Sequence, residues 1–224
     1  MPVWHRLRDV ALEEHDSNTG ALVISLGGNA FAEDERLMSM AGQFRFAETA
    51  LAPMGDLLKG DRPCLVTHGN GPQVGYILTR VEEALGKAYR LPLEVCVAES
   101  EGEIGYVLQQ TLHNLAAGRR AVATLLTQVV VSAEDPAFAN PTKPVGPWFS
   151  AEEAAALAEG GMDLVYDGSG RGRRVVASPR PLAIVESATI ARLLSLGVVV
   201  IAAGGGGIPV VDSGGRLEGV EAVV

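Results

Sequence analysis

Short apolar runs that end in glycine alternate along the chain with longer segments of helical periodicity. The runs lie at 21–26, 64–67 and 198–203, and each has the length of a strand buried on both faces. Between them, apolar residues recur three and four positions apart, as in the stripes at 40–58 and 104–115. This alternation predicts an α/β fold with a mostly parallel sheet and helices on both of its faces.

Glycine and proline predict where several elements stop. Pro53 lies inside the first helical stripe, so we expect a break there. Pro72 suits the first turn of a helix, whereas Gly118 and Gly197 are typical of helix ends. The apolar segment 121–131 is predicted to be strand.

Residues 132–182 interrupt this rhythm and predict a small protruding subdomain. Prolines gather in the segment, which makes long regular elements unfavourable there. Ser150 and Glu153 have the spacing of a capping box, ahead of a helix at about 151–159. The string DGSGRGR at 167–173 predicts the turn of a hairpin.

The composition narrows the classes of function. The chain has 224 residues and a net charge of −9, which does not favour nucleic acid as a partner. No apolar run reaches the roughly 20 residues that a membrane span needs. Residues 1–20 are polar and unlike a secretory signal, so we expect an N-terminal extension before one domain at 21–224. Cys64 and Cys96 are too few for a disulfide framework or a thiolate metal site, and they predict reduced thiols in a cytoplasmic protein.

Three of the predicted strand ends carry glycine-rich loops. They are GGN at 27–29, HGNG at 68–71 and GGGG at 204–207. The carboxyl ends of parallel strands meet at one edge of a sheet, where ligands bind. Glycine lets the backbone approach a ligand and present N–H groups to an anion. One such loop is commonly only a tight turn, but three together predict a phosphate site.

Two common nucleotide motifs fit this sequence poorly. The Walker string GxxxxGK[ST] does not occur. The segment 69–75 approaches the dinucleotide fingerprint GxGxxG, but its third glycine comes one position late. A dehydrogenase is therefore kept only as a distant alternative.

Longer motifs carry a resemblance to a known family. In chain order they are LGGNAF (26–31), THGNGPQVG (67–75), DPAFANPTKPVGPW (135–148), RRVVASPRP (173–181) and AAGGGGIPVV (202–211). Together these segments resemble the carbamate kinases, which belong to the amino-acid-kinase fold family. The resemblance spans nearly the whole chain, and HGNGPQVG, NPTKPVGP and GGGGIPV are its most specific parts.

The resemblance implies a three-layer α/β/α sandwich that bears the protruding subdomain. It implies phosphoryl transfer between ATP and carbamate, giving ADP and carbamoyl phosphate, with Mg²⁺ on the nucleotide and no metal site of the protein's own. It also implies a homodimer that acts in the catabolism of arginine or related nitrogen compounds. Carbamate is already a nucleophile, so this chemistry needs positioning and charge stabilisation rather than a catalytic triad.

The resemblance also gives roles to particular residues. The groups on the transferred phosphoryl would be Gly27, Gly28, Asn29 and the mobile cation Lys143 of the NPTKP motif. The substrate-binding residues would be Gly69, Asn70, Gly71, Gly204, Gly205, Gly206, Gly207 and Arg174.

Several of these residues also have a plain structural interpretation. Lys143 by itself could be a solvated loop lysine. His68 could act as a general base, but the reaction needs none, so we favour a hydrogen-bonding or structural histidine. Arg173 and Arg174 either hold the protruding element or bind an anion. The acidic run at 99–103 is interpreted as the solvated start of a helix.

The sequence departs from the family pattern in two places. The turn before Arg173 reads GRGRR without the usual aromatic residue, so we expect the protruding loop to pack differently. The sequence stops at GVEAVV, where the family continues into an Asp-Lys-Asp motif and a nucleotide-binding lobe. We therefore expect the C-terminal part of the fold to be missing and the strand at 198–203 to expose apolar surface. A non-catalytic fragment or partner subunit that binds carbamoyl phosphate is the alternative function.

Overall fold

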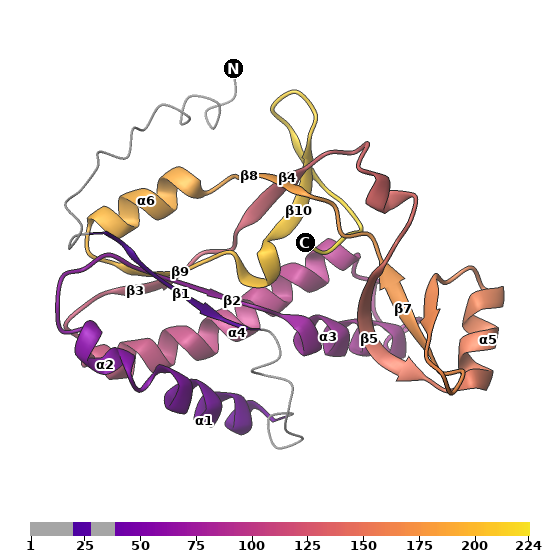
Figure 1. Cartoon of the computed structure of the whole chain (residues 1–224), viewed down its shortest axis with the longest axis horizontal. Helices are drawn as coiled ribbons and strands as arrows, with labels where there is room; N and C mark the ends of the chain where they lie inside the picture. The colour runs from indigo at the N-terminus through magenta and orange to yellow at the C-terminus, as the bar shows by residue number, and fades with distance from the viewer. Residues whose placement is uncertain (1–19, 28–38) are drawn as a thin grey trace.

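A parallel sheet forms the centre of the computed structural model, which describes residues 20–27 and 39–224 (Figure 1). Its strand order is β1-β2-β9-β3, and every neighbouring pair is parallel. The strands are β1 (Leu22–Leu26), β2 (Cys64–His68), β3 (Val122–Thr124) and β9 (Val199–Ile201). All three residues of β9 are fully buried, as expected of a strand that is covered on both faces.

Helices cover both faces of this sheet (Figure 1). On one face lie α1 (Met40–Leu51), α2 (Met54–Leu57) and α4 (Leu93–Ala116), and on the other lies α6 (Ser187–Ser195). The α1–α4 face buries the larger core, which includes Leu51, Val66, Ile104, Leu108, Leu112 and Ile201. The predicted α/β class, the mostly parallel sheet and the three-layer sandwich are confirmed.

Most of the predicted helix boundaries are confirmed. Pro53 separates α1 from α2, and Gly197 follows α6 with a φ of +78°. Helix α3 (Gly71–Glu83) has Pro72 in its first turn, where its missing N–H has no partner to lose. Helix α4 begins at Leu93, eleven positions before the stripe from which it was predicted, and ends just before Gly118.

Two expectations about strands are wrong. The segment 121–131 contains two strands, β3 and β4 (Gln128–Val131), because the chain leaves the first sheet between them and joins a second one. Strand β9 lies between β2 and β3, so its apolar run is covered and does not form an exposed edge. Sheet order is set by contacts between distant segments, which local patterns do not contain.

The second sheet has the order β11-β10-β4-β8, in which only the β4–β10 pair is parallel. Its remaining strands are β8 (Pro181–Ile184), β10 (Ile208–Asp212) and β11 (Leu217–Gly219). After β11 the chain returns to the segment that follows β7 (Gly172–Val176), where the Val223 N–H donates to the Ala177 carbonyl at 3.0 Å.

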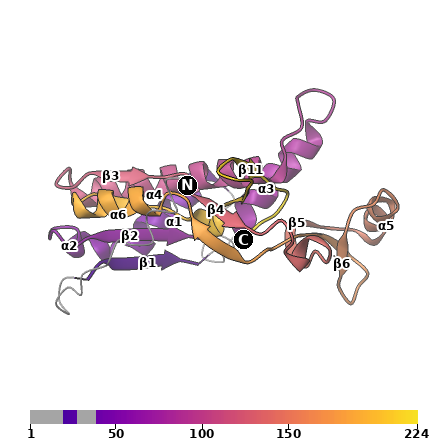
Figure 2. The same cartoon turned by 90° about the horizontal axis from the view of Figure 1, so that it is seen from above.

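A third sheet stands away from the other layers at one end of the molecule (Figure 2). It is antiparallel, in the order β5-β7-β6, and α5 packs against it. The elements are β5 (Lys143–Phe149), α5 (Ala151–Glu159), β6 (Leu164–Tyr166) and β7 (Gly172–Val176). The predicted Ser150–Glu153 capping box and the hairpin at 167–173 are both present.

This protruding sheet meets the rest of the molecule where α3 crosses β5. A Cβ added to Gly75 would stand 2.8 Å from the Gly146 Cα, so the two backbones touch without side chains between them. Gly146 also has a φ of +73°, within the irregular part of β5. The predicted subdomain limits, 132–182, stay a prediction, and the extension at 1–20 lies almost wholly outside the described residues. None of the described helices has the length and apolarity to cross a bilayer.

Candidate functional site

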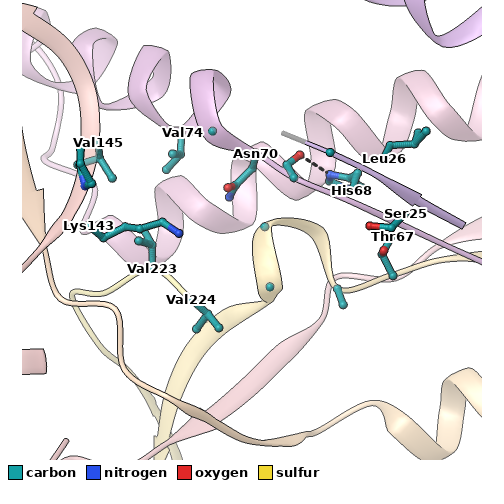
Figure 3. Close-up of a pocket in the computed structure, with 17 residues that line it drawn as sticks. Ser25, Leu26, Thr67, His68, Asn70, Val74, Lys143, Val145, Val223 and Val224 are labelled. Atoms are coloured by element: carbon teal, nitrogen blue, oxygen red, sulfur yellow. Dashed lines mark hydrogen bonds between the residues drawn. The ribbon is translucent and has the colours of Figure 1, made fainter. Parts of the chain in front are cut away.

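A cavity of about 640 Å³ opens at the carboxyl ends of β1, β2 and β9. The start of β5 closes it on one side, and the residues that follow β11 contribute a further wall (Figure 3). It is lined by Ser25, Leu26, Gly27, Thr67, His68, Gly69, Asn70, Gly71, Val74, Lys143, Pro144, Val145, Ala203, Gly205, Gly206, Val223 and Val224. Three glycine loops from separate parts of the sequence thus meet at one place.

The charge of the cavity is unlike that of the chain as a whole. The chain carries a net charge of −9, but the described lining residues include no Asp or Glu side chain. Lys143 is exposed, its amino group is directed into the cavity (Figure 3), and it forms no ion pair with a described residue. A cavity with one cation, many backbone amides and no acidic side chain is suited to a small anion.

His68 is buried at the end of β2 and supports the cavity from behind. Because a carbonyl only accepts, the 2.9 Å contact between Nδ1 and the Gly69 oxygen places the proton of the neutral ring on Nδ1. Burial lowers the pKa of His68, and this hydrogen bond opposes the shift without cancelling it. The ring is therefore neutral at pH 7, in agreement with the hydrogen-bonding role expected for it.

The loop after β9 is shaped by close contacts. Gly205 has a φ of +62°, and a Cβ there would stand 2.2 Å from the Asn70 amide nitrogen. A Cβ on Gly204 would stand 2.4 Å from the His68 ring. Ala203, which precedes them, adopts a φ of +55° that is uncommon for a residue with a side chain. Only glycine allows the loop to lie this close to β2 and α3.

The structure brings most of the predicted site residues together. Those that line the cavity are Gly27, Gly69, Asn70, Gly71, Lys143, Gly205 and Gly206. Gly204 and Gly207 lie behind the lining, packed against His68 and against Val129. Gly28 and Asn29 lie outside the described residues, so their predicted contact with the phosphoryl group stays a prediction.

Arg174 does not join these residues. It lines a second cavity of about 720 Å³ between α3 and the protruding sheet, and its Nη1 lies 3.7 Å from a carboxylate oxygen of Glu82. Its neighbour Arg173 donates from Nε to the Gly146 carbonyl at 2.8 Å and lies over the Trp148 ring. Both contacts favour the interpretation that these arginines hold the protruding element.

Two hydroxyl side chains that line the cavity were not predicted from the sequence. Ser25 and Thr67 are register partners on β1 and β2, and both line the cavity near the glycine loops (Figure 3). Their position in the sequence could have indicated this place in the cavity. Each lies one or two residues before the point where a strand ends in a glycine loop.

Glu101 contradicts the prediction that the acidic run at 99–103 is solvated. The run 99–103 was interpreted as solvated, but Glu101 is only 1% exposed in the middle of α4. Its Oε2 accepts the Thr127 N–H at 2.8 Å, and its Oε1 has no hydrogen-bond partner among the described residues. Burial raises the pKa of Glu101 to about 8; the charge of Glu186 adds to the rise, and the Thr127 bond opposes it. The available signal was the spacing of Val97, Glu101 and Ile104, which places the acid on the apolar stripe.

Comparison with known proteins gives the family. A family model described as the amino acid kinase family matches residues 20–219. The carbamate kinase of Clostridium perfringens is 44% identical over 210 residues, which cover 91% of this chain and 67% of that protein. The carbamate kinase-like protein YqeA of Escherichia coli is 46% identical over 210 residues, covering 91% and 66%.

Solved structures agree with these relatives. The carbamate kinase of Giardia lamblia bound to AMP-PNP matches with a TM-score of 0.80 at 39% identity, over 93% of this chain and 67% of that one. The same kinase bound to citric acid gives 0.82 at 38% identity, over 93% and 68%. The chain thus belongs to the amino acid kinase family and, within it, to the carbamate kinases. It spans about two thirds of the length of the relatives that it matches.

Proposed function

We propose that the chain binds carbamoyl phosphate in the glycine-lined cavity and takes part in reversible phosphoryl transfer between ATP and carbamate. The observation that carries this proposal is a cavity built from three strand-end loops, with Lys143 directed into it and no acidic side chain among its described lining. Its relationship to carbamate kinases supports the choice of anion.

The step asks for little covalent chemistry from the protein. In the ATP-forming direction a β-phosphate oxygen of ADP attacks the phosphorus of carbamoyl phosphate, and the bond from phosphorus to the carbamoyl oxygen breaks. Carbamate leaves as an anion, so no proton has to be moved, and the neutral His68 is not needed as a base. The protein holds the two anions in line and stabilises the charge on the transferred group.

Particular groups of the chain are suited to that task. The first N–H groups of α3 have no partner within the helix and lie at the positive end of its dipole. The Gly205 N–H has no partner among the described residues. Lys143 supplies a positive charge from a strand of the protruding sheet.

The nucleotide is the second substrate in this proposal. A relative's structure contains the ATP analogue AMP-PNP, which supports nucleotide binding by the family. Among the described residues no cluster of three or more metal-ligating side chains is found, and the described cavity lining offers no Asp or Glu side chain to Mg²⁺. We infer that magnesium enters as part of the substrate, held by the nucleotide phosphates.

The remaining parts of the proposal follow from the family resemblance. We infer a homodimer located in the cytoplasm, acting in the catabolism of arginine or related nitrogen compounds. Light scattering on the purified chain measures the oligomeric state, and a monomer at assay concentrations would contradict the homodimer.

A coupled assay for ATP formation from carbamoyl phosphate and ADP tests the main proposal. We expect turnover that saturates with both substrates. Saturable binding of carbamoyl phosphate without turnover would instead support the alternative, a binding protein that transfers no phosphoryl group. Absence of both binding and turnover would contradict the two functions together.

A further inference from the structure

Glu101 connects to the glycine loop through a short chain of hydrogen bonds. Its Oε2 accepts the Thr127 backbone N–H at 2.8 Å, and the Thr127 hydroxyl in turn accepts the Ala203 N–H at 2.8 Å. Ala203 is the residue in the left-handed conformation that leads into the loop. The side chain of Glu101 thus helps to fix the backbone from which the loop starts.

Glu101 also packs directly behind the loop. Its Cγ lies 3.0 Å from the point where a Cβ on Gly204 would stand, and a nitrogen of His68 lies 2.6 Å from the same point. The acid is fully buried, and its Oε1 has no described partner. The Glu101 side chain therefore packs against the loop that lines the anion cavity.

We propose that Glu101 is a positioning residue that must be neutral for the cavity to hold a doubly negative anion, so that anion binding is coupled to uptake of a proton by Glu101. The proposal rests on the proposed function for the identity of the natural anion. The coupling itself concerns any divalent anion in the cavity.

The charged groups around Glu101 agree with this role. His68 faces it from β2, is neutral, and has its own proton committed to the Gly69 carbonyl. Glu186, ahead of α6, adds negative charge and is held by Gln128. On the neighbouring turn of α4, Glu103 pairs with Arg80 of α3 and with Gln43 of α1. None of these contacts places a cation on the Glu101 carboxylate.

The direction of the coupling follows from electrostatics. An ionised Glu101 would place a poorly screened negative charge behind the loop and oppose the bound anion. The anion in turn favours the protonated acid, so its binding raises the pKa of Glu101, which is about 8 in the free protein. Between pH 7 and 9 the affinity for the anion therefore falls as the pH rises.

Isothermal titration calorimetry with sulfate tests this coupling, since sulfate stays a dianion throughout that range. For the unaltered chain we expect the affinity to fall about tenfold from pH 7 to pH 9, with uptake of up to about half a proton per sulfate at pH 8, measured in buffers of different ionisation enthalpy. Glu101→Gln keeps the acceptor for the Thr127 N–H but cannot ionise, so its affinity stays within about twofold over the range. Glu99→Gln, on an exposed position of the same helix, is the matched control and keeps the pH dependence.

The outcomes separate the coupling from the proposed function. If Glu101→Gln retains the pH dependence and the proton uptake, another group is responsible and the coupling is wrong. If sulfate binds with the expected pH dependence but carbamoyl phosphate gives neither tight binding nor turnover, the coupling stands and the proposed function fails. A carbon-13 titration of the Glu101 carboxyl group in the unaltered chain needs no variant, and an unchanged pKa on adding sulfate would overturn the proposal.

Discussion

The two cavities beside α3 have similar volumes, about 640 and 720 Å³, but very different linings. The first is lined by glycine loops and one lysine, and its described lining holds no acidic side chain. The second lies between α3 and the protruding sheet, with apolar side chains, two arginines and three acids along its walls. Opposite charges close together in the second cavity compensate one another, whereas the cation in the first has no partner among the described residues.

This difference shows that the size of a cavity says little about what it binds. An anion gains from groups that are aimed at it and already desolvated, and the first cavity offers such groups. The two cavities share a wall, because α3 presents Val74 to the first and Leu78 to the second. Substitutions can therefore be chosen that affect one cavity, the other, or both.

The largest effect is expected from removing the cation of the first cavity. We expect Lys143→Ala to lower kcat for ATP formation about 100-fold, while ADP affinity changes less than about twofold, since the cation acts on the transferred phosphoryl group. Steady-state kinetics and ADP titration measure the two quantities. Lys87→Ala, at an exposed position outside both cavities, is the control. Turnover of Lys143→Ala within about twofold of the unaltered chain would remove Lys143 from the site.

Filling the glycine loop should have the next largest effect. Gly205→Ala adds a Cβ that collides with the Asn70 amide, so we expect carbamoyl phosphate to bind at least about tenfold more weakly. Gly214→Ala is a matched control, because its φ of +70° imposes the same backbone strain and nothing lies within 4 Å of the added atom. Both variants should lose about 1–2 kcal/mol of stability. Equal affinities in the two variants would show that the loop does not contact the ligand.

Disturbing the shared wall should change both cavities. In Gly75→Ala the new Cβ meets the Gly146 backbone, which cannot rotate away, so we expect about 1–3 kcal/mol lower stability in urea unfolding. Lys143 lies on the displaced strand, and carbamoyl phosphate affinity should fall with the stability. Gly102→Ala, at an open position of α4, should instead gain up to about 1 kcal/mol. A stable Gly75→Ala variant with unchanged affinity would contradict the close backbone contact.

The smallest effect is expected from the arginine of the second cavity. Arg174→Ala removes the contact with Glu82, and we expect carbamoyl phosphate affinity to stay within about twofold. The loss of stability should be at most about 1 kcal/mol, as for other partly exposed ion pairs. A tenfold loss of affinity would mean that Arg174 acts on the anion, the role that the family resemblance gave it.

Much of the fold and the first cavity could be predicted from local patterns. Glycine after a short apolar run indicates a strand end, and parallel strands deliver such ends to one edge, so the meeting of Gly69 with Gly205 could be expected from the sequence. The break at Pro53 and the cap at Ser150 follow from backbone chemistry within a few residues.

The parts that could not be predicted depend on contacts between distant segments. The place of β9 between β2 and β3 is fixed by packing across more than a hundred residues, and no local signal in 198–203 records it. Glu101 was misread because acidic neighbours made the run look solvated, although its own position belongs to the buried stripe of α4. Arg174 was predicted to bind the anion, because the motif does not show on which side of β7 its side chain lies.

The anion cavity owes most of its donors to peptide groups rather than to side chains. Any substitution other than one to proline leaves the peptide N–H in place, so this part of the recognition is inherited together with the course of the chain. Substitutions among relatives can alter this recognition only where a glycine gains a side chain or a loop moves. Redesign toward another anion would therefore begin at the side chains of the lining, above all Lys143, and at the arm that carries it.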